Sequence, residues 1–179
     1  MWGIRELFSV FGTLHNSGEN IELEIFGDKI HNPKDDPSFK QEVITHLTED
    51  PGVIWHKAVS RDMLLASLHK MHIGWAYRHK DLEDSTRELS TKILEYASAG
   101  VPVILSRNEI NEEVFGTQYP LFVDSLEEAI ELLSYYSKNK QELEAIASQV
   151  VDVSKTFTFE EVRKDLLGQN LIRIQEPKF

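Results

Sequence analysis

The sequence predicts an α/β fold in which helices cover both faces of a doubly wound parallel sheet, followed by a helical C-terminus. Helical and strand patterns alternate along the 179 residues, which is the order that right-handed β-α-β crossovers require. Val101–Leu105 is almost wholly apolar, as expected for a strand buried on both faces of such a sheet. Ligands of these sheets lie beyond the carboxyl ends of the strands, so residues that follow a strand are the candidates for a site.

The N-terminal half opens with a helix, because apolar residues recur at helical spacing from Ile4 to Leu14. Asn16-Ser17-Gly18 ends that pattern, and charged, unpatterned residues at 78–88 predict a loop. Strands are expected at residues 23–26, 53–55 and 73–77, and helices at residues 38–47 and from the N-cap Ser60 onward.

The C-terminal half has clearer helix boundaries. Ser90 is expected to cap a helix that ends at Gly100, with Pro102 just beyond it. Short strands are expected at residues 101–105 and 122–123. Three further helices are each predicted by a capping box: Ser125 with Glu128, Asn139 with Glu142, and Thr158 with Glu161. The chain is therefore expected to form one domain over residues 1–179, with a helical extension at residues 155–179.

The composition excludes several classes of function. Thirty acidic and 19 basic residues give a net charge of −11, which argues against binding nucleic acid or an anionic membrane. The chain has no cysteine, so disulfide scaffolds and thiol nucleophiles are excluded. No apolar run approaches the roughly 18 residues of a membrane span, and the first residues do not resemble a signal peptide. A cytoplasmic location is expected.

The acidic total conceals a basic segment. Residues 54–80 contain five lysines or arginines against a single acid, Asp62. Two of the expected strand-end loops, at His56-Lys57 and at Arg78, belong to this segment. A basic rim suits an anionic small ligand such as a diphosphate, so Lys57 and Arg78 are interpreted as ligand-facing. For Arg61 and Lys70, a ligand-facing role and a solvated position on a helix surface fit the sequence equally well.

Residues 90–104 form the most informative stretch. The free N–H groups at a helix N-terminus bind phosphate. Here the helix starts at Ser90 and Thr91, and Lys92 adds a positive charge beside their N–H groups. Glu95 lies three residues beyond Lys92, on the same helix face and about one turn deeper. A carboxylate there can accept hydrogen bonds from a ribose diol while the helix start holds a diphosphate.

The pattern Ser-x-Lys-x-x-Glu-Tyr-x-x-x-Gly-x-Pro-Val, from Ser90 to Val103, closely resembles the donor-binding helix of GT-B glycosyltransferases, especially those of family 4. Weaker similarities flank it at residues 23–27, 122–130 and 157–160, so the resemblance covers roughly residues 4–171. It implies the Rossmann-like C-terminal half of a GT-B enzyme that transfers sugar from a UDP- or GDP-sugar, with retention and without a metal or other cofactor.

The resemblance also implies roles for individual residues. Glu95 would bind the ribose, and Thr91 and Lys92, beside Ser90, would contact the diphosphate. The loops at His56-Lys57 and at Arg78 would approach the base and the phosphates. The implied setting is polysaccharide synthesis, in which the full enzyme could associate peripherally with a membrane.

Two departures from the family pattern bear on these expectations. Many members carry a glutamate eight positions before the ribose acid, where this chain has Arg87, with Glu88 beside it. Family domains also open with a strand and a basic loop, whereas this chain starts in the helix that follows them. We therefore expect a fragment of a two-domain enzyme whose acceptor-binding N-terminal domain is missing. The fragment alone is expected to be inactive, and no catalytic residue is assigned.

Two alternatives remain at this point. Nucleotide-sugar 2-epimerases share the fold but arrange their acids and histidines differently, and a non-catalytic doubly wound module would bind no nucleotide. The sequence contains no P-loop, G-x-G-x-x-G or G-x-S-x-G motif, which disfavours ATPases, nicotinamide dehydrogenases and α/β-hydrolases. His69 and His72 are interpreted as a surface pair rather than as metal ligands.

Overall fold

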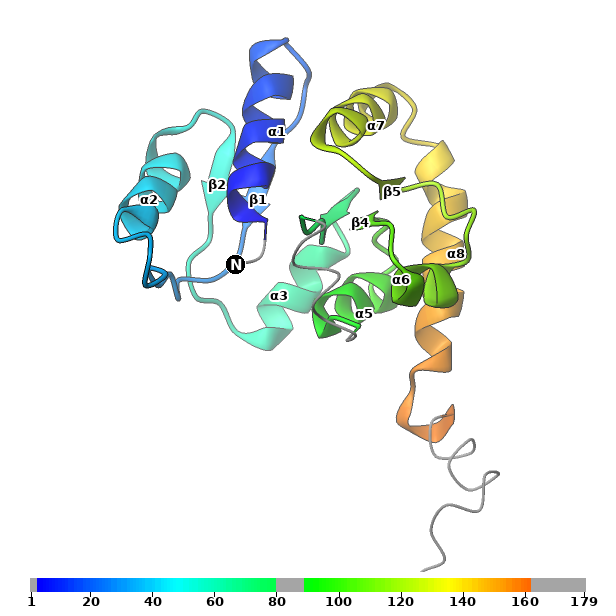
Figure 1. Cartoon of the computed structure of the whole chain (residues 1–179). Helices are drawn as coiled ribbons and strands as arrows, with labels where there is room; N and C mark the ends of the chain where they lie inside the picture. The colour runs from blue at the N-terminus through cyan, green and yellow to red at the C-terminus, as the bar shows by residue number, and fades with distance from the viewer. Residues whose placement is uncertain (1–2, 80–88, 162–179) are drawn as a thin grey trace, which may run out of the picture.

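The computed structural model describes residues 3–79 and 89–161. Its five strands are short, and every strand pairing is parallel (Figure 1). One sheet has two strands, β1 (Leu23–Ile25) and β2 (Val53–Trp55), and the other has three in the order β3 (Gly74–Trp75), β4 (Val103–Ser106) and β5 (Phe122–Val123). The predicted parallel α/β fold is confirmed, but its strands form two sheets instead of one.

Seven helices are placed among these strands in the described ranges. They are α1 (Ile4–Asn16), α2 (Phe39–Glu49), α3 (Arg61–Leu68), α5 (Thr91–Ser98), α6 (Glu109–Phe115), α7 (Leu126–Lys138) and α8 (Glu142–Thr156). The helix α1 packs against α7, and α5 packs against α8 on the other side of the three-stranded sheet (Figure 1). Over residues 3–79 and 89–161, none of the helices is long and apolar enough to cross a membrane.

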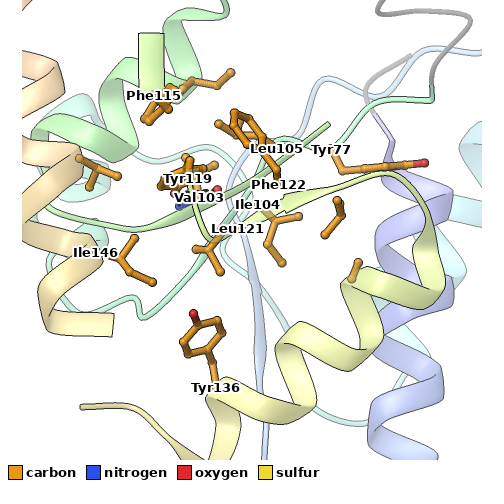
Figure 2. Close-up of a cluster of buried hydrophobic side chains, with 14 of the residues drawn as sticks. Tyr77, Val103, Ile104, Leu105, Phe115, Tyr119, Leu121, Phe122, Tyr136 and Ile146 are labelled. Atoms are coloured by element: carbon orange, nitrogen blue, oxygen red, sulfur yellow. Dashed lines mark hydrogen bonds between the residues drawn. The ribbon is translucent and has the colours of Figure 1, made fainter. Parts of the chain in front are cut away.

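The main core surrounds β4, whose four residues are all buried. Side chains from both helix layers meet on this strand, including Phe115 of α6, Tyr136 of α7 and Ile146 of α8 (Figure 2). The phenol of Tyr119 fixes the start of the strand, because it accepts the Val103 N–H and donates to the Val103 carbonyl, both at 2.9 Å. Burial on both faces explains why β4 reads as a continuous apolar run.

A second, smaller core lies under the two-stranded sheet. Its buried members are Phe8 of α1 and Phe39, Val43 and Leu47 of α2. The other side of α1 contributes Val10 and Leu14 to the main core. A single helix therefore contacts both cores and holds the two sheets together.

Three local expectations need correction. The helix α6 was not predicted, because it has only seven residues and directly follows a strand; Asn108 caps it by accepting the Asn111 N–H at 2.7 Å. Asn139 does not begin α8 but ends α7, where its amide donates to the Tyr135 carbonyl at 2.8 Å. Ser90 occupies the N-cap position of α5, yet its hydroxyl accepts no capping hydrogen bond.

The other capping expectations hold. Ser125 caps α7 by accepting the Glu128 N–H at 3.1 Å. Thr158 accepts the Glu161 N–H at 3.4 Å, as its capping box predicts. Within the expected extension at residues 155–179, residues 162–179 lie outside the described part of the chain.

Candidate functional site

The carboxyl end of β3 and the first turn of α5 meet at a small pocket. Its lining consists of Ala76, Tyr77 and Arg78 from the strand end and Ser90 and Lys92 from the helix start. Three of the residues selected from the sequence, Arg78, Ser90 and Lys92, are thus brought together although up to 14 positions separate them. The pocket lies where doubly wound folds place their ligands, beyond the strand ends.

The backbone at Arg78 is held in place by β4. The hydroxyl of Ser106 accepts the Arg78 N–H at 2.8 Å and donates to the Arg78 carbonyl at 2.6 Å. Asn111 in turn donates its amide to the Ser106 carbonyl at 2.9 Å, and both Ser106 and Asn111 are buried. These bonds fix the point at which the chain leaves β3 for the pocket.

The helix α5 is positioned by close contact with β3. A Cβ built at Gly74 would lie only 2.8 Å from the ring of Tyr96, so only glycine allows this approach. Burial raises the pKa of the Tyr96 phenol, while its contact with the Trp75 backbone opposes that shift. Lys92 and Glu95, on the same helix, are thereby held at a fixed distance from the strand end.

The start of α5 gathers positive charge without an acid in its first turn. Lys92 occupies the second helical position, where the helix dipole already disfavours a cation. Its pKa is lowered below the usual value, first because the surrounding chain removes water from the ammonium and second because Arg78 is near. The residue still keeps an exposed surface, so a ligand can reach it. An anion in the pocket would relieve this repulsion.

Glu95 lies one turn further along α5, and its side chain is 38 % exposed. Its carboxylate is 3.8 Å from the guanidinium of Arg61, which stands at the start of α3 and is 77 % exposed. An exposed ion pair at this distance contributes little stability, so Glu95 remains available to a ligand. This contact also places Arg61 beside the site. From the sequence alone, Arg61 was equally consistent with a solvated position on the helix surface.

His56 and Lys57 lie elsewhere, at the carboxyl end of β2 in the two-stranded sheet. His56 stacks on Phe26 with ring centroids 4.4 Å apart and contacts the Glu24 carboxylate at 2.8 Å. Lys57 adopts a positive φ of 57° and holds its ammonium 5.5 Å from the ring centre of Trp55. Both side chains thus contact residues of the two-stranded sheet.

The remaining sequence candidates are placed as follows. Thr91 is the first residue of α5 and is exposed beside the pocket. Arg87 and Glu88 lie outside the described residues. No cluster of three or more histidines, aspartates or glutamates that could hold a metal occurs in residues 3–79 and 89–161.

The sequence places Ser106 at the strand-end rim, near the expected cleft, because it comes at the end of the apolar run. It does not predict that the Ser106 hydroxyl holds the backbone of Arg78. The next residue, Arg107, is occupied by other groups: it donates to Glu112 at 2.8 Å and to the Thr117 carbonyl at 3.1 Å.

No curated protein matches the chain. A family model described as glycosyl transferase-like matches residues 10–168, which is most of the chain and includes every residue of the pocket. The chain therefore belongs to the glycosyl transferase-like family.

Proposed function

We propose that this chain is the donor-binding half of a GT-B glycosyltransferase of the family 4 type, and that it binds a nucleotide sugar such as a UDP- or GDP-sugar. Membership of the glycosyl transferase-like family supports glycosyl transfer as the general chemistry. The observation that carries the donor proposal is the meeting of Arg78, Lys92 and the N-terminus of α5, with Glu95 one turn away.

The diphosphate is proposed to lie against the first turn of α5. The N–H groups of Thr91 and Lys92 have no helical acceptor, as is usual at a helix start, and can donate to phosphate oxygens. The Ser90 hydroxyl makes no capping bond and can donate as well. The negative charge of the ligand would then offset the repulsion that Arg78 exerts on the Lys92 ammonium.

The ribose is proposed to lie one helical turn deeper, at Glu95. A carboxylate accepts hydrogen bonds from both hydroxyls of a ribose diol. The competing partner is Arg61, whose exposed contact at 3.8 Å is weak enough for a ligand to replace. His56 and Lys57 lie at the end of the other sheet. We therefore propose only that they approach the base of the nucleotide.

Catalysis would depend on the leaving group, a nucleoside diphosphate. Helix N–H groups and the Lys92 ammonium would stabilise the charge that develops on its phosphate as the bond between the anomeric carbon and the phosphate oxygen breaks. We propose that a further, N-terminal domain holds the acceptor, that transfer proceeds with retention without a bound metal, and that the enzyme acts in the cytoplasm on a polysaccharide acceptor.

Calorimetric titration with UDP, GDP and ADP tests this proposal. We expect saturable binding of one of them to the wild-type chain and weaker binding to Glu95→Gln, because the variant cannot offer two anionic acceptors to the ribose diol. The corresponding nucleoside monophosphate should bind more weakly than the diphosphate. Equal affinity of wild type and Glu95→Gln for every nucleotide would contradict the role of Glu95.

A further inference from the structure

A row of charged side chains leads from the pocket to the start of α3. Arg78 and Lys92 line the pocket, and Glu95 follows Lys92 one helical turn along the same face of α5. The Glu95 carboxylate in turn lies 3.8 Å from the guanidinium of Arg61, which is not part of the pocket lining. The row therefore has cations at both ends and an acid between them. A nucleoside diphosphate carries its diphosphate, ribose and base in a matching order.

The proposed donor site gives a ligand group to every member of this row except Arg61. The Arg61 side chain is 77 % exposed, and its contact with Glu95 is longer than a hydrogen bond. Among the described residues, its guanidinium makes this ion pair and no hydrogen bond. When ribose hydroxyls occupy Glu95, Arg61 loses its partner. The next group of the ligand beyond the ribose is the base.

The backbone at Arg61 is fixed, whereas its side chain is open to a ligand. Ser60 caps α3 by accepting the Met63 N–H at 3.3 Å. Only three residues separate Arg61 from Lys57, whose carbonyl accepts the Gly27 N–H at 2.7 Å. Met63 in the same turn is 60 % exposed, so an apolar side chain is uncovered beside Arg61. A base can therefore approach this turn without displacing part of the fold.

The chemistry of the guanidinium distinguishes the bases. Arginine presents a planar fork of N–H donors and no acceptor. Guanine has two neighbouring acceptors, O6 and N7, that match this fork. Adenine carries an amino group in place of O6, so a donor fork meets another donor there. Uracil has O4 but no second acceptor beside it on that edge.

We propose that the base of the nucleotide is guanine and that Arg61 recognises it by donating to O6 and N7. The sugar donor is then a GDP-sugar, and Arg61 is the residue that selects its base. This inference rests on the proposed function, because it requires a nucleotide whose ribose lies at Glu95. In the unliganded chain the guanidinium stays beside Glu95, and in the complex it turns to the base.

The first test is calorimetric titration of the wild-type chain and of Arg61→Gln with GDP, UDP and ADP. The wild type should bind GDP most tightly, by roughly tenfold or more. A glutamine amide offers one donor and one acceptor, which match N7 and the N6 amino group of adenine. Arg61→Gln should therefore bind GDP roughly tenfold more weakly and move the preference toward ADP. Arg61→Lys keeps the charge but not the fork, so it too should lose affinity for GDP.

A second measurement needs no variant. In 7-deaza-GDP a C–H group replaces N7, so it should bind the wild-type chain several-fold more weakly than GDP does. Inosine diphosphate keeps both O6 and N7 and lacks only the 2-amino group. It should bind as tightly as GDP, because the proposed fork does not contact that amino group.

Three results would overturn the guanine assignment. They are tighter binding of UDP or ADP than of GDP by the wild type, equal affinity for GDP and 7-deaza-GDP, and an equal loss of affinity for all three nucleotides in Arg61→Gln. If Glu95→Gln still weakens nucleotide binding in these cases, the proposed donor site stands and only the role of Arg61 falls. If no nucleotide binds the wild type, the proposed function falls and this inference falls with it.

Discussion

At the scale of single residues, the site is the place where Arg78 and Lys92 meet the N-terminus of α5. Lys92 stands in the first turn of α5, near Arg78, and its pKa is lowered by lost hydration and by that neighbour. Both effects disfavour the charged form of Lys92. A bound diphosphate turns both cations into favourable partners, which is the physical basis of the proposed role.

Lys92→Ala should weaken binding of the preferred nucleoside diphosphate by roughly 10- to 100-fold, because a hydrogen bond to a charged group is worth about 1.5–3 kcal/mol. Calorimetric titration measures this. Lys70→Ala is the matched control, since Lys70 is an exposed lysine beyond the end of α3, away from the pocket lining. Equal losses in the two variants would mean that only overall charge matters.

Ser106→Ala should lower the free energy of unfolding by about 1–3 kcal/mol, because it leaves the Arg78 N–H and carbonyl without their partner. Urea denaturation measures the change. Ser98→Ala, an exposed serine that bonds only within its own helix, should change stability by less than about 0.5 kcal/mol. If Ser106→Ala also changes the free energy of unfolding by less than about 0.5 kcal/mol, the Ser106 hydroxyl does not hold the backbone of Arg78 in place.

Part of this residue-level arrangement could be predicted from the sequence. Ser90, Lys92 and Glu95 are close along one helix, so their shared face follows from helical spacing. Arg78 could be added because strand ends converge in a parallel sheet. The contacts of Ser106 and Arg61 could not be predicted, since they depend on how β4 and α3 pack against other elements. The contacts of His56 and Lys57 with their neighbours in the two-stranded sheet could not be predicted for the same reason.

At the scale of elements, contacts between α5 and β3 determine where the site stands. Tyr96 lies against Gly74, and a methyl group there would overlap its ring. The sequence predicted both elements but not this contact. It also missed α6, because a helix of two turns has too few residues for a periodic pattern, and it assigned Asn139 to the wrong helix because a cap residue can serve either end.

Gly74→Ala should destabilise the protein by about 1–3 kcal/mol, the usual cost of overpacking a core. Gly12→Ala is the matched control, because Gly12 lies within α1 with nothing within 4 Å of an added Cβ. That substitution should stabilise the protein by about 0.5–1 kcal/mol. Thermal or urea denaturation of both variants tests the pair, and effects of equal sign would contradict the packing described for α5.

The Glu19 carboxylate ties the end of α1 to α7. It accepts hydrogen bonds from Lys138, Ser134 and Ser137, which lower its pKa from 4.5 to about 2. A carboxylate whose pKa is lowered by folding stabilises the protein above its unfolded pKa. This stabilisation is lost as the pH falls through the folded value.

Glu19→Gln should therefore be destabilising at pH 6, and the difference from wild type should shrink as the pH is lowered from about 4.5 toward 2. Urea midpoints measured across this range give the result. Glu144→Gln, on the exposed face of α8, should cause a small difference at every pH. A Glu19→Gln effect that stays constant down to pH 2 would rule out ionisation as its cause.

At the scale of the whole molecule, α1 joins two parallel sheets and two cores. The alternation of helices and strands predicted the fold class, but it could not predict that the strands would form separate sheets. Strand order in a parallel sheet depends on residues far apart in sequence, and the sequence pattern of a strand does not name its neighbour. The family match covers the strands of both sheets.

The proposed nucleotide site is tested most directly by an NMR titration of the labelled chain with UDP, GDP and ADP. We predict that one of them shifts the amide signals of Thr91, Lys92 and Arg78 in a saturable way, and that Lys92→Ala weakens the response. The central claim would be contradicted if millimolar concentrations of all three nucleotides left these amides unmoved, or if wild type and Lys92→Ala responded equally.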